Sequence, residues 1–139
     1  MTAPHLRYRE FLEALSPETI DRLPDFVAAD VRFADPFNDA RGVDAMAAVF
    51  RHMFGSLGAV TFKVARLSFD GEVCLMVWRF SSTLRGKPWS FDGMSVVRFD
   101  AEGKVVKHVD HWDAAANFYE RLPVIGWLLA RIRTRLAIR

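Results

Sequence analysis

The feature that most limits how this chain can fold is a change of hydrophobic period near residue 60. Beyond it, apolar and polar side chains alternate in four runs, at about residues 60–69, 72–84, 88–99 and 104–113. Short turn signals separate the runs, and these are Asp70-Gly71, Arg85-Gly86 and Ala101-Glu102-Gly103. Alternation with a period of two indicates half-buried strands, and short glycine-containing turns indicate hairpins. The four runs therefore predict an antiparallel meander.

The segments before the meander have helical spacing instead. Tyr8, Phe11 and Leu12 predict a first helix over about residues 5–15, and a short second helix is interrupted by Pro24. A third helix is predicted by a stripe of apolar residues at three- and four-residue spacing: Met46, Val49, Phe50, Met53 and Phe54. Helices that precede a curved sheet, and must cover it, predict an α+β domain with segregated layers.

Composition places the chain among soluble globular proteins, with 51% apolar and 26% charged residues. Cys74 is the only cysteine, so a disulfide or a cysteine-based zinc site cannot form within one chain. The first residues lack the apolar stretch of a secretory signal, so we expect a cytoplasmic location.

The last run of the meander, KHVDHWD at residues 107–113, concentrates polar and aromatic side chains. Side chains alternate across a sheet, and Lys107 and His111 favour the face in water. His108, Asp110 and Trp112 are then predicted to point inward. A buried carboxylate is costly unless it is paired, hydrogen-bonded or protonated. Two interpretations stay open here: a satisfied hydrogen-bond network, or an acid/base pair in a cavity.

Two segments carry a resemblance to a known family: FADPFNDARGVDAM, before the meander, and FDAEGKVVKHVDHWD, at its end. Over about residues 6–119 the chain resembles the nuclear transport factor 2-like superfamily, and within it the SnoaL-like polyketide cyclases and the ketosteroid isomerases. The resemblance implies a cone in which helices and a curved antiparallel sheet enclose a deep apolar pocket. It also implies a homodimer formed through the outer face of the sheet.

The resemblance implies roles for individual residues as well. Asp35 stands where ketosteroid isomerases keep their general base, whereas their oxyanion-binding tyrosine falls on Phe11, with Tyr8 one turn away. Their second oxyanion donor falls on Ser95. Steroid isomerisation by that mechanism is therefore not expected.

Limonene epoxide hydrolases are similar in a different residue. Their last-strand aspartate matches Asp110, but their other catalytic groups fall on Met76, Trp78, Phe33 and Asp35. Most of that hydrolytic machinery is therefore replaced. SnoaL-like cyclases use a pocket acid/base to move a proton, and this chain offers Asp35, His108 and Asp110 as candidate catalytic residues for such work.

From these residues we expect a pocket for a small, largely apolar molecule. Its predicted wall consists of Phe37, Phe50, Phe54, Trp78, Phe80, Phe91, Ser95, Val97 and Trp112. If the protein is an enzyme, proton transfer is expected, as in an isomerase, a cyclase or a hydratase-like lyase, without a cofactor and without a metal. The alternative is a non-catalytic ligand-binding or dimeric assembly domain.

The end of the chain differs in composition from the rest. Five arginines and no acid follow Glu120, which leaves 14 basic and 17 acidic residues in 1–120 and no basic face for nucleic acid. Pro123 opens a predicted helix that ends near Leu136. We therefore divide the chain into a cone domain, 1–122, and an apolar, arginine-rich helix, 123–139, which is not an independent domain. The helix is expected to dock on the domain or on a partner subunit, and contact with an anionic membrane surface is the alternative.

Overall fold

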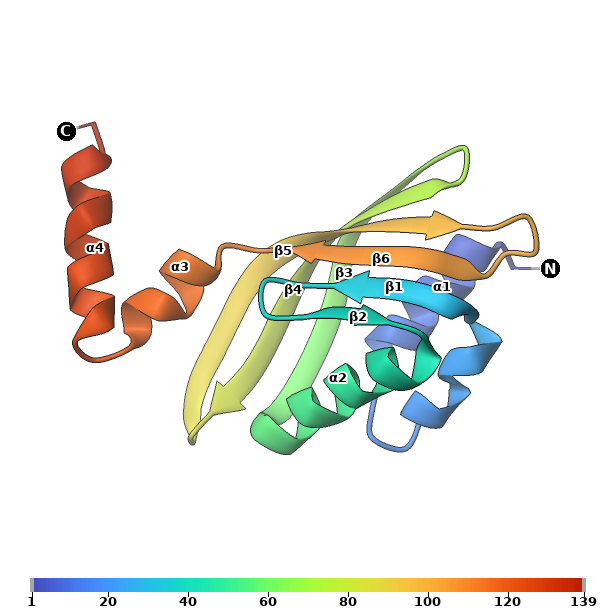
Figure 1. Ribbon diagram of the computed structural model, residues 1–139, viewed down its shortest axis with the longest axis horizontal. Coiled ribbons are helices and arrows are strands. Elements are labelled where there is room, and N and C mark those ends of the chain that lie inside the picture. Colours follow the sequence, from blue (N-terminus) through green and yellow to red (C-terminus); the bar gives the residue numbers. More distant parts are fainter. Residues whose placement is uncertain (1, 139) are drawn as a thin grey trace.

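A six-stranded curved sheet is the frame of the computed structural model, which describes residues 2–138 (Figure 1). The strand order is β2-β1-β6-β5-β4-β3. The strands are β1 (Val27–Ala34), β2 (Asp39–Arg41), β3 (Gly58–Asp70), β4 (Val73–Leu84), β5 (Lys87–Phe99) and β6 (Val105–His111). β3 to β6 pair antiparallel in sequence order, which confirms the predicted meander.

One strand pair is not antiparallel. β1 runs parallel to β6, with Phe33 opposite His108, so the sheet is mixed rather than fully antiparallel as expected. Because parallel neighbours end at the same edge, the residues that follow β1 come beside the end of β6. This pairing brings Asp35 and Asp110 to one side of the molecule.

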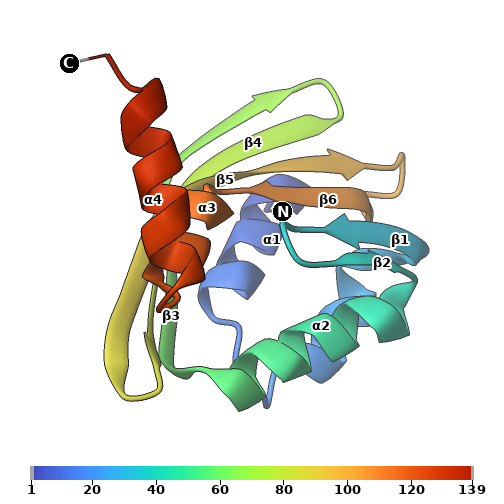
Figure 2. The same ribbon diagram turned by 60° about the vertical axis from the view of Figure 1, so that its left-hand side comes forward.

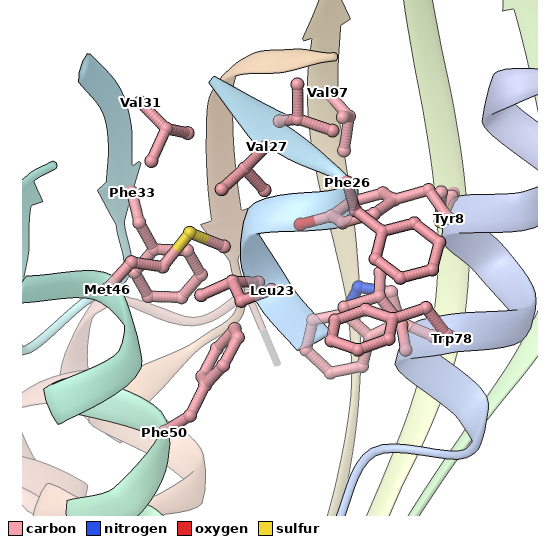
Figure 3. Packing of buried hydrophobic residues seen from close by; sticks show 14 of the residues in the cluster. Tyr8, Leu23, Phe26, Val27, Val31, Phe33, Met46, Phe50, Trp78 and Val97 are labelled. Atoms are coloured by element: carbon pink, nitrogen blue, oxygen red, sulfur yellow. The ribbon is translucent and has the colours of Figure 1, made fainter. Parts of the chain in front are cut away.

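The helices α1 (Pro4–Glu13) and α2 (Val43–Ser56) lie on the concave side of the sheet, together with the short 3-10 helix η1 (Ile20–Asp25) (Figure 2). The predicted apolar stripe of α2 is the buried side of that helix. Figure 3 shows Met46 and Phe50 directed toward Phe33 of β1, and the rings of Phe33 and Phe50 meet edge to face with centroids 5.3 Å apart. These contacts close the α+β core at one end of the cone.

The outer face of the sheet is partly apolar. Leu75 and Val77 of β4 are exposed, and each lies opposite a half-buried apolar residue of β5, Val96 and Met94 respectively. Val96 in turn faces Val109 of β6. These five residues form one continuous patch, which we call the outer apolar patch.

The chain ends in α3 (Ala114–Asn117), the 3-10 turn η2 (Tyr119–Arg121) and α4 (Ile125–Leu136). Asp113 caps α3 by accepting a hydrogen bond from the Ala116 N–H at 2.9 Å. α4 packs on η2, and Figure 1 shows it standing away from the sheet. The expected docking of this helix on its own domain is therefore limited to η2, and most of the apolar side chains of α4 remain exposed.

Candidate functional site

A cavity of about 550 Å³ lies between the concave face of the sheet and α2. Ligand pockets commonly have volumes of about 300–1,000 Å³. Most of the wall is aromatic or aliphatic and includes Trp78, Trp89 and Trp112. Phe37 and Tyr119 line the cavity and are also exposed, so they stand at an open end. The cavity is large enough for a small apolar ring compound.

The residues predicted for the site fall into two groups. Those that line the cavity are Asp35, Phe37, Phe50, Phe54, Trp78, Phe80, Phe91, His108, Asp110 and Trp112. Ser95 and Val97 do not line it, which corrects the predicted wall. Both point inward but are fully buried, because the cone is filled with side chains at that level of the sheet. Alternation gives the direction of a side chain but not the depth at which the cavity ends.

Asp110 is held by a chain of hydrogen bonds that starts in β4. Trp78 Nε1 donates to Ser95 Oγ at 2.8 Å, and Ser95 Oγ donates to Asp110 Oδ1 at 2.5 Å. On the other side, His108 Nε2 lies 2.6 Å from the same Oδ1. Thus Ser95 is buried outside the cavity and orients the Asp110 carboxylate by a hydrogen bond, without contacting a ligand itself.

The Trp78 indole determines where the hydrogens of this network lie, because an indole N–H can donate a hydrogen bond but cannot accept one. The Ser95 hydroxyl therefore accepts from Trp78, and its own hydrogen is free for Asp110. With Asp110 ionised, His108 Nε2 carries a hydrogen toward Oδ1 and Nδ1 is left as an acceptor. Tyr8 Oη, 2.7 Å from Nδ1, then donates to it. Every hydrogen bond in this network is therefore donated in the direction of Asp110.

Tyr8 is the site residue that sequence reasoning missed. Its side chain is fully buried, and this burial raises the pKa of Tyr8 well above its ordinary value, with the charge of Asp110 adding to the rise. The phenol therefore stays protonated as a donor. Tyr8 shares the helical stripe of Phe11, so the sequence predicted a helix at this position but not a site residue. The one available signal was its position one turn from the position of the family's tyrosine.

The position of the Trp78 indole depends on Gly93, which lies directly opposite it on β5. A Cβ added at Gly93 would lie 2.5 Å from Trp78 Cη2, too close for any side chain. The missing side chain makes room for the indole beside β5, so that Nε1 can reach Ser95. Gly93 is thus part of what orients the site.

Asp35 lines the cavity but is engaged in its own loop. Its Oδ1 accepts the backbone N–H groups of Phe37 and Asn38, each at 2.7 Å, and the Asn38 amide at 3.1 Å. Such side-chain-to-backbone bonds are those of an Asx turn, which here closes the connection between β1 and β2. The contacts of Asp35 are therefore structural, whereas Asp110 Oδ2 receives no hydrogen bond from residues 2–138.

Within the described chain, no three histidine, cysteine or carboxylate side chains gather closely enough to hold an ion. Both ring nitrogens of His108 are already engaged, Nε2 by Asp110 Oδ1 and Nδ1 by Tyr8. Cys74 is fully buried, and burial raises the pKa of its thiol to about 11, as expected of a core residue.

Solved structures with the same fold are numerous. A limonene epoxide hydrolase-like epoxide hydrolase from M. tuberculosis is 22% identical, covers 100% of each chain and has a TM-score of 0.71. A protein with a ketosteroid isomerase-like fold from Catenulispora acidiphila DSM 44928, solved with trimethylamine, is 13% identical over 84% of this chain and 91% of that one, with a TM-score of 0.72.

A third similar structure is TerC, which was co-crystallised with polyporic acid. It is 16% identical over 81% of this chain and 91% of that one, with a TM-score of 0.69. At such identities the likeness shows the fold alone. No curated protein matches the sequence.

The sequence itself matches the SnoaL-like domain over residues 8–108. This segment begins at Tyr8 and ends at His108, the two residues joined across the core, and it contains the cavity's α2 and sheet walls through β5. The chain therefore belongs to the SnoaL-like domain family and has the nuclear transport factor 2-like fold that the sequence predicts.

Proposed function

We propose that the protein binds a small, largely apolar molecule in this cavity and that Asp110 transfers a proton on it. The observation that carries the proposal is the asymmetry of the Asp110 carboxylate. Oδ1 is held by Ser95 and His108, whereas Oδ2 receives no hydrogen bond from the described residues. The Asp110 side chain also lines the apolar cavity. A carboxylate fixed through one oxygen can accept and return a proton through the other.

The network suits both protonation states of Asp110. When Oδ2 takes a proton from a C–H or O–H group of the ligand, Oδ1 becomes a carbonyl oxygen and still accepts from Ser95 and His108. No donor has to rotate during the transfer. If the proton then returns to another ligand atom, the result is an isomerisation, or a cyclisation when a carbon–carbon bond forms in between. In a hydration, Asp110 takes the proton from a water molecule whose oxygen bonds to the ligand, and returns it to a neighbouring ligand atom. None of these reactions needs a cofactor.

The same geometry separates the roles of the three predicted catalytic residues. Both ring nitrogens of His108 are engaged, by Tyr8 and by Asp110, so we assign His108 to positioning. Asp35 holds its loop. This leaves Asp110 as the residue that contacts the reacting atoms.

Outer-face dimerisation belongs to the same proposal. The outer apolar patch leaves Leu75 and Val77 exposed, and a second copy of the chain is the partner that would cover an identical patch symmetrically. The dimer would leave the cavity, on the opposite face of the sheet, free for ligand.

The proposal can be tested without knowing the natural ligand. A panel of apolar ring ketones is titrated against tryptophan fluorescence, because three of the four tryptophans line the cavity. For compounds that bind, deuterium uptake next to the carbonyl is followed in D₂O by mass spectrometry. We expect Asp110→Asn to keep binding and to slow the exchange about 10²–10⁴-fold.

Asp113→Asn is the matched control, since that carboxylate is exposed and caps α3. Exchange that survives in Asp110→Asn contradicts the assigned base. Binding without exchange in the wild-type protein favours the non-catalytic ligand-binding function instead.

A further inference from the structure

Helix α4 presents an apolar strip that no described residue covers. Ile125, Leu128, Ile132 and Leu136 recur at three- and four-residue spacing, so they share one side of the helix. They are 59%, 53%, 48% and 81% exposed. The side of α4 that touches the domain is a different one, because it contains Gly126, which is buried against the Glu120 backbone. The strip is free to meet a partner.

Arginines border the strip on both sides. At 3.6 residues per turn, Arg133 lies about 100° from Ile132 on one flank, and Arg131 and Arg135 lie on the other. Arg133 is paired with Glu120 at 2.8 Å, and the Arg131 guanidinium lies over the Trp127 ring, 5.1 Å from its centroid. No acidic residue follows Glu120 in the sequence. The partner must therefore offer an apolar region for the strip and negative charges for the arginines beside it.

Two other occupants satisfy only half of this requirement. A nucleic acid would contact the arginines but would leave the apolar strip in water. The outer apolar patch of a second copy would cover the strip, but the exposed cations Arg66 and Arg98 lie beside it on the same sheet face, where Asp92 is already paired with Arg79. Those charges would face the arginines of α4.

We propose that α4 is a peripheral anchor that lies on an anionic lipid surface. The apolar strip is buried among the lipid acyl chains, and the arginines on its flanks contact the anionic headgroups. With 12 residues, α4 is about 18 Å long, shorter than the hydrocarbon core of about 30 Å. Nowhere in residues 2–138 is there a helix with the length and hydropathy needed to cross a bilayer. The helix therefore lies in the interface.

The anchor is joined to the cavity. Phe118 and Tyr119 line the cavity, and η2, which begins at Tyr119, is the element on which α4 packs. A Cβ at Gly126 would overlap the Glu120 carbonyl oxygen, so this close packing requires glycine. An open end of the cavity is thus held next to the lipid surface. Resting on the function proposed above, this placement assigns the ligand to apolar molecules that partition into membranes.

Flotation of the full chain with vesicles tests the anchor. We expect binding to vesicles of phosphatidylglycerol mixed with phosphatidylcholine, and little binding to phosphatidylcholine alone. Arg131→Gln with Arg135→Gln should lower the partition coefficient about fivefold for each arginine removed. Ile132→Gln should lower it about tenfold or more, because one large side chain no longer enters the apolar phase. Arg41→Gln with Arg85→Gln, two exposed arginines outside α4, is the control of equal charge.

Three results overturn the anchor: no binding to the anionic vesicles, binding that the α4 variants retain, or an oligomer that Ile132→Gln dissociates in place of vesicle binding. Ketone binding, measured without vesicles, separates this inference from the proposed function. The α4 variants should keep it. If the wild-type protein binds anionic vesicles but binds none of the ketones, the result contradicts the proposed function and leaves the membrane anchor standing.

Discussion

Tyr8 Oη lies 2.7 Å from His108 Nδ1, although the two residues are 100 positions apart in the chain. Tyr8 belongs to the first helix and His108 to the last strand, so the contact forms only when both ends of the domain are in place. Because the other nitrogen of His108 bonds Asp110, the phenol controls the orientation of the ring that orients the carboxylate. The site therefore depends on α1, whose Tyr8 acts on the carboxylate through His108.

Tyr8→Phe should destabilise the protein but keep the His108 tautomer, because Asp110 Oδ1 still accepts a hydrogen from Nε2. The variant leaves a buried ring nitrogen without its donor, which costs about 1–3 kcal/mol of unfolding free energy. Urea denaturation measures the cost, and nitrogen-15 NMR of the imidazole reports which nitrogen carries the hydrogen. Tyr119→Phe is the control, since that hydroxyl makes no hydrogen bond within residues 2–138. Equal stability of the two variants would show that the Tyr8 contact contributes nothing.

Gly93→Ala should displace the Trp78 indole. The added methyl would lie 2.5 Å from Trp78 Cη2 and 2.9 Å from the His111 carbonyl oxygen, so the ring must move and its bond to Ser95 must lengthen. Overpacking of this kind costs about 1–3 kcal/mol. Denaturation and the tryptophan emission spectrum measure both effects.

Gly55→Ala provides the comparison for that variant. Nothing lies within 4 Å of a Cβ at Gly55, and the residue is inside α2, where alanine is favoured by about 0.5–1 kcal/mol. We therefore expect the two glycine variants to change stability in opposite directions. The same sign for both would mean that the space around Gly93 is less restricted than the structure indicates.

The sheet and α2 were predictable because their signals are local. The period of two and the turn glycines specify β3 to β6, and the apolar stripe specifies the buried side of α2. The parallel pairing of β1 with β6 has no local signal, since it depends on how the N-terminal helices cross the sheet. The same holds for Tyr8, whose partner is defined only by that packing.

The candidate site was predictable in direction but not in depth. Alternation placed His108, Asp110 and Ser95 on one face, and all three do point inward. It could not tell that Ser95 lies behind the wall, because cavity depth is set by the volumes of facing side chains such as Trp78. Nor could it tell that Asp35 closes its own loop, since the Asx-turn contacts depend on the path of residues 35–38.

Asp35→Asn distinguishes a loop residue from a base. Asparagine keeps the Oδ1 acceptor for the N–H groups of Phe37 and Asn38, so the loop should persist. We expect stability and deuterium exchange to stay within a few-fold of the wild-type protein, as measured by denaturation and by the D₂O assay. A loss as large as that of Asp110→Asn would return the role of base to Asp35.

Val77→Lys should convert the proposed homodimer to a monomer. Val77 is exposed in the outer apolar patch, and burying a lysine against an identical patch leaves its charge unpaired. Sedimentation velocity measures the change in mass. Ala48→Lys, at an exposed position of α2 far from this face, is the control and should stay dimeric. A wild-type protein that sediments as a monomer at all concentrations contradicts the proposed interface.

The stability of the fold should fall with rising pH above about pH 9. The Cys74 thiol has a pKa of about 11 in the folded protein and an ordinary value of 9.0, so between these values the unfolded chain has lost a proton that the folded chain keeps. Deprotonation then favours unfolding, and the loss is on the order of 2 kcal/mol across the window. Tyr8, whose pKa is also raised by burial, adds to the loss above its ordinary value of 10.0. Urea denaturation at several alkaline pH values measures the slope. Cys74→Ala removes the part of the slope that begins near pH 9 and leaves the Tyr8 part, whereas Tyr8→Phe does the reverse. If both variants keep the wild-type slope, the alkaline loss arises elsewhere, and these two side chains are not the groups that hold their protons in the folded state.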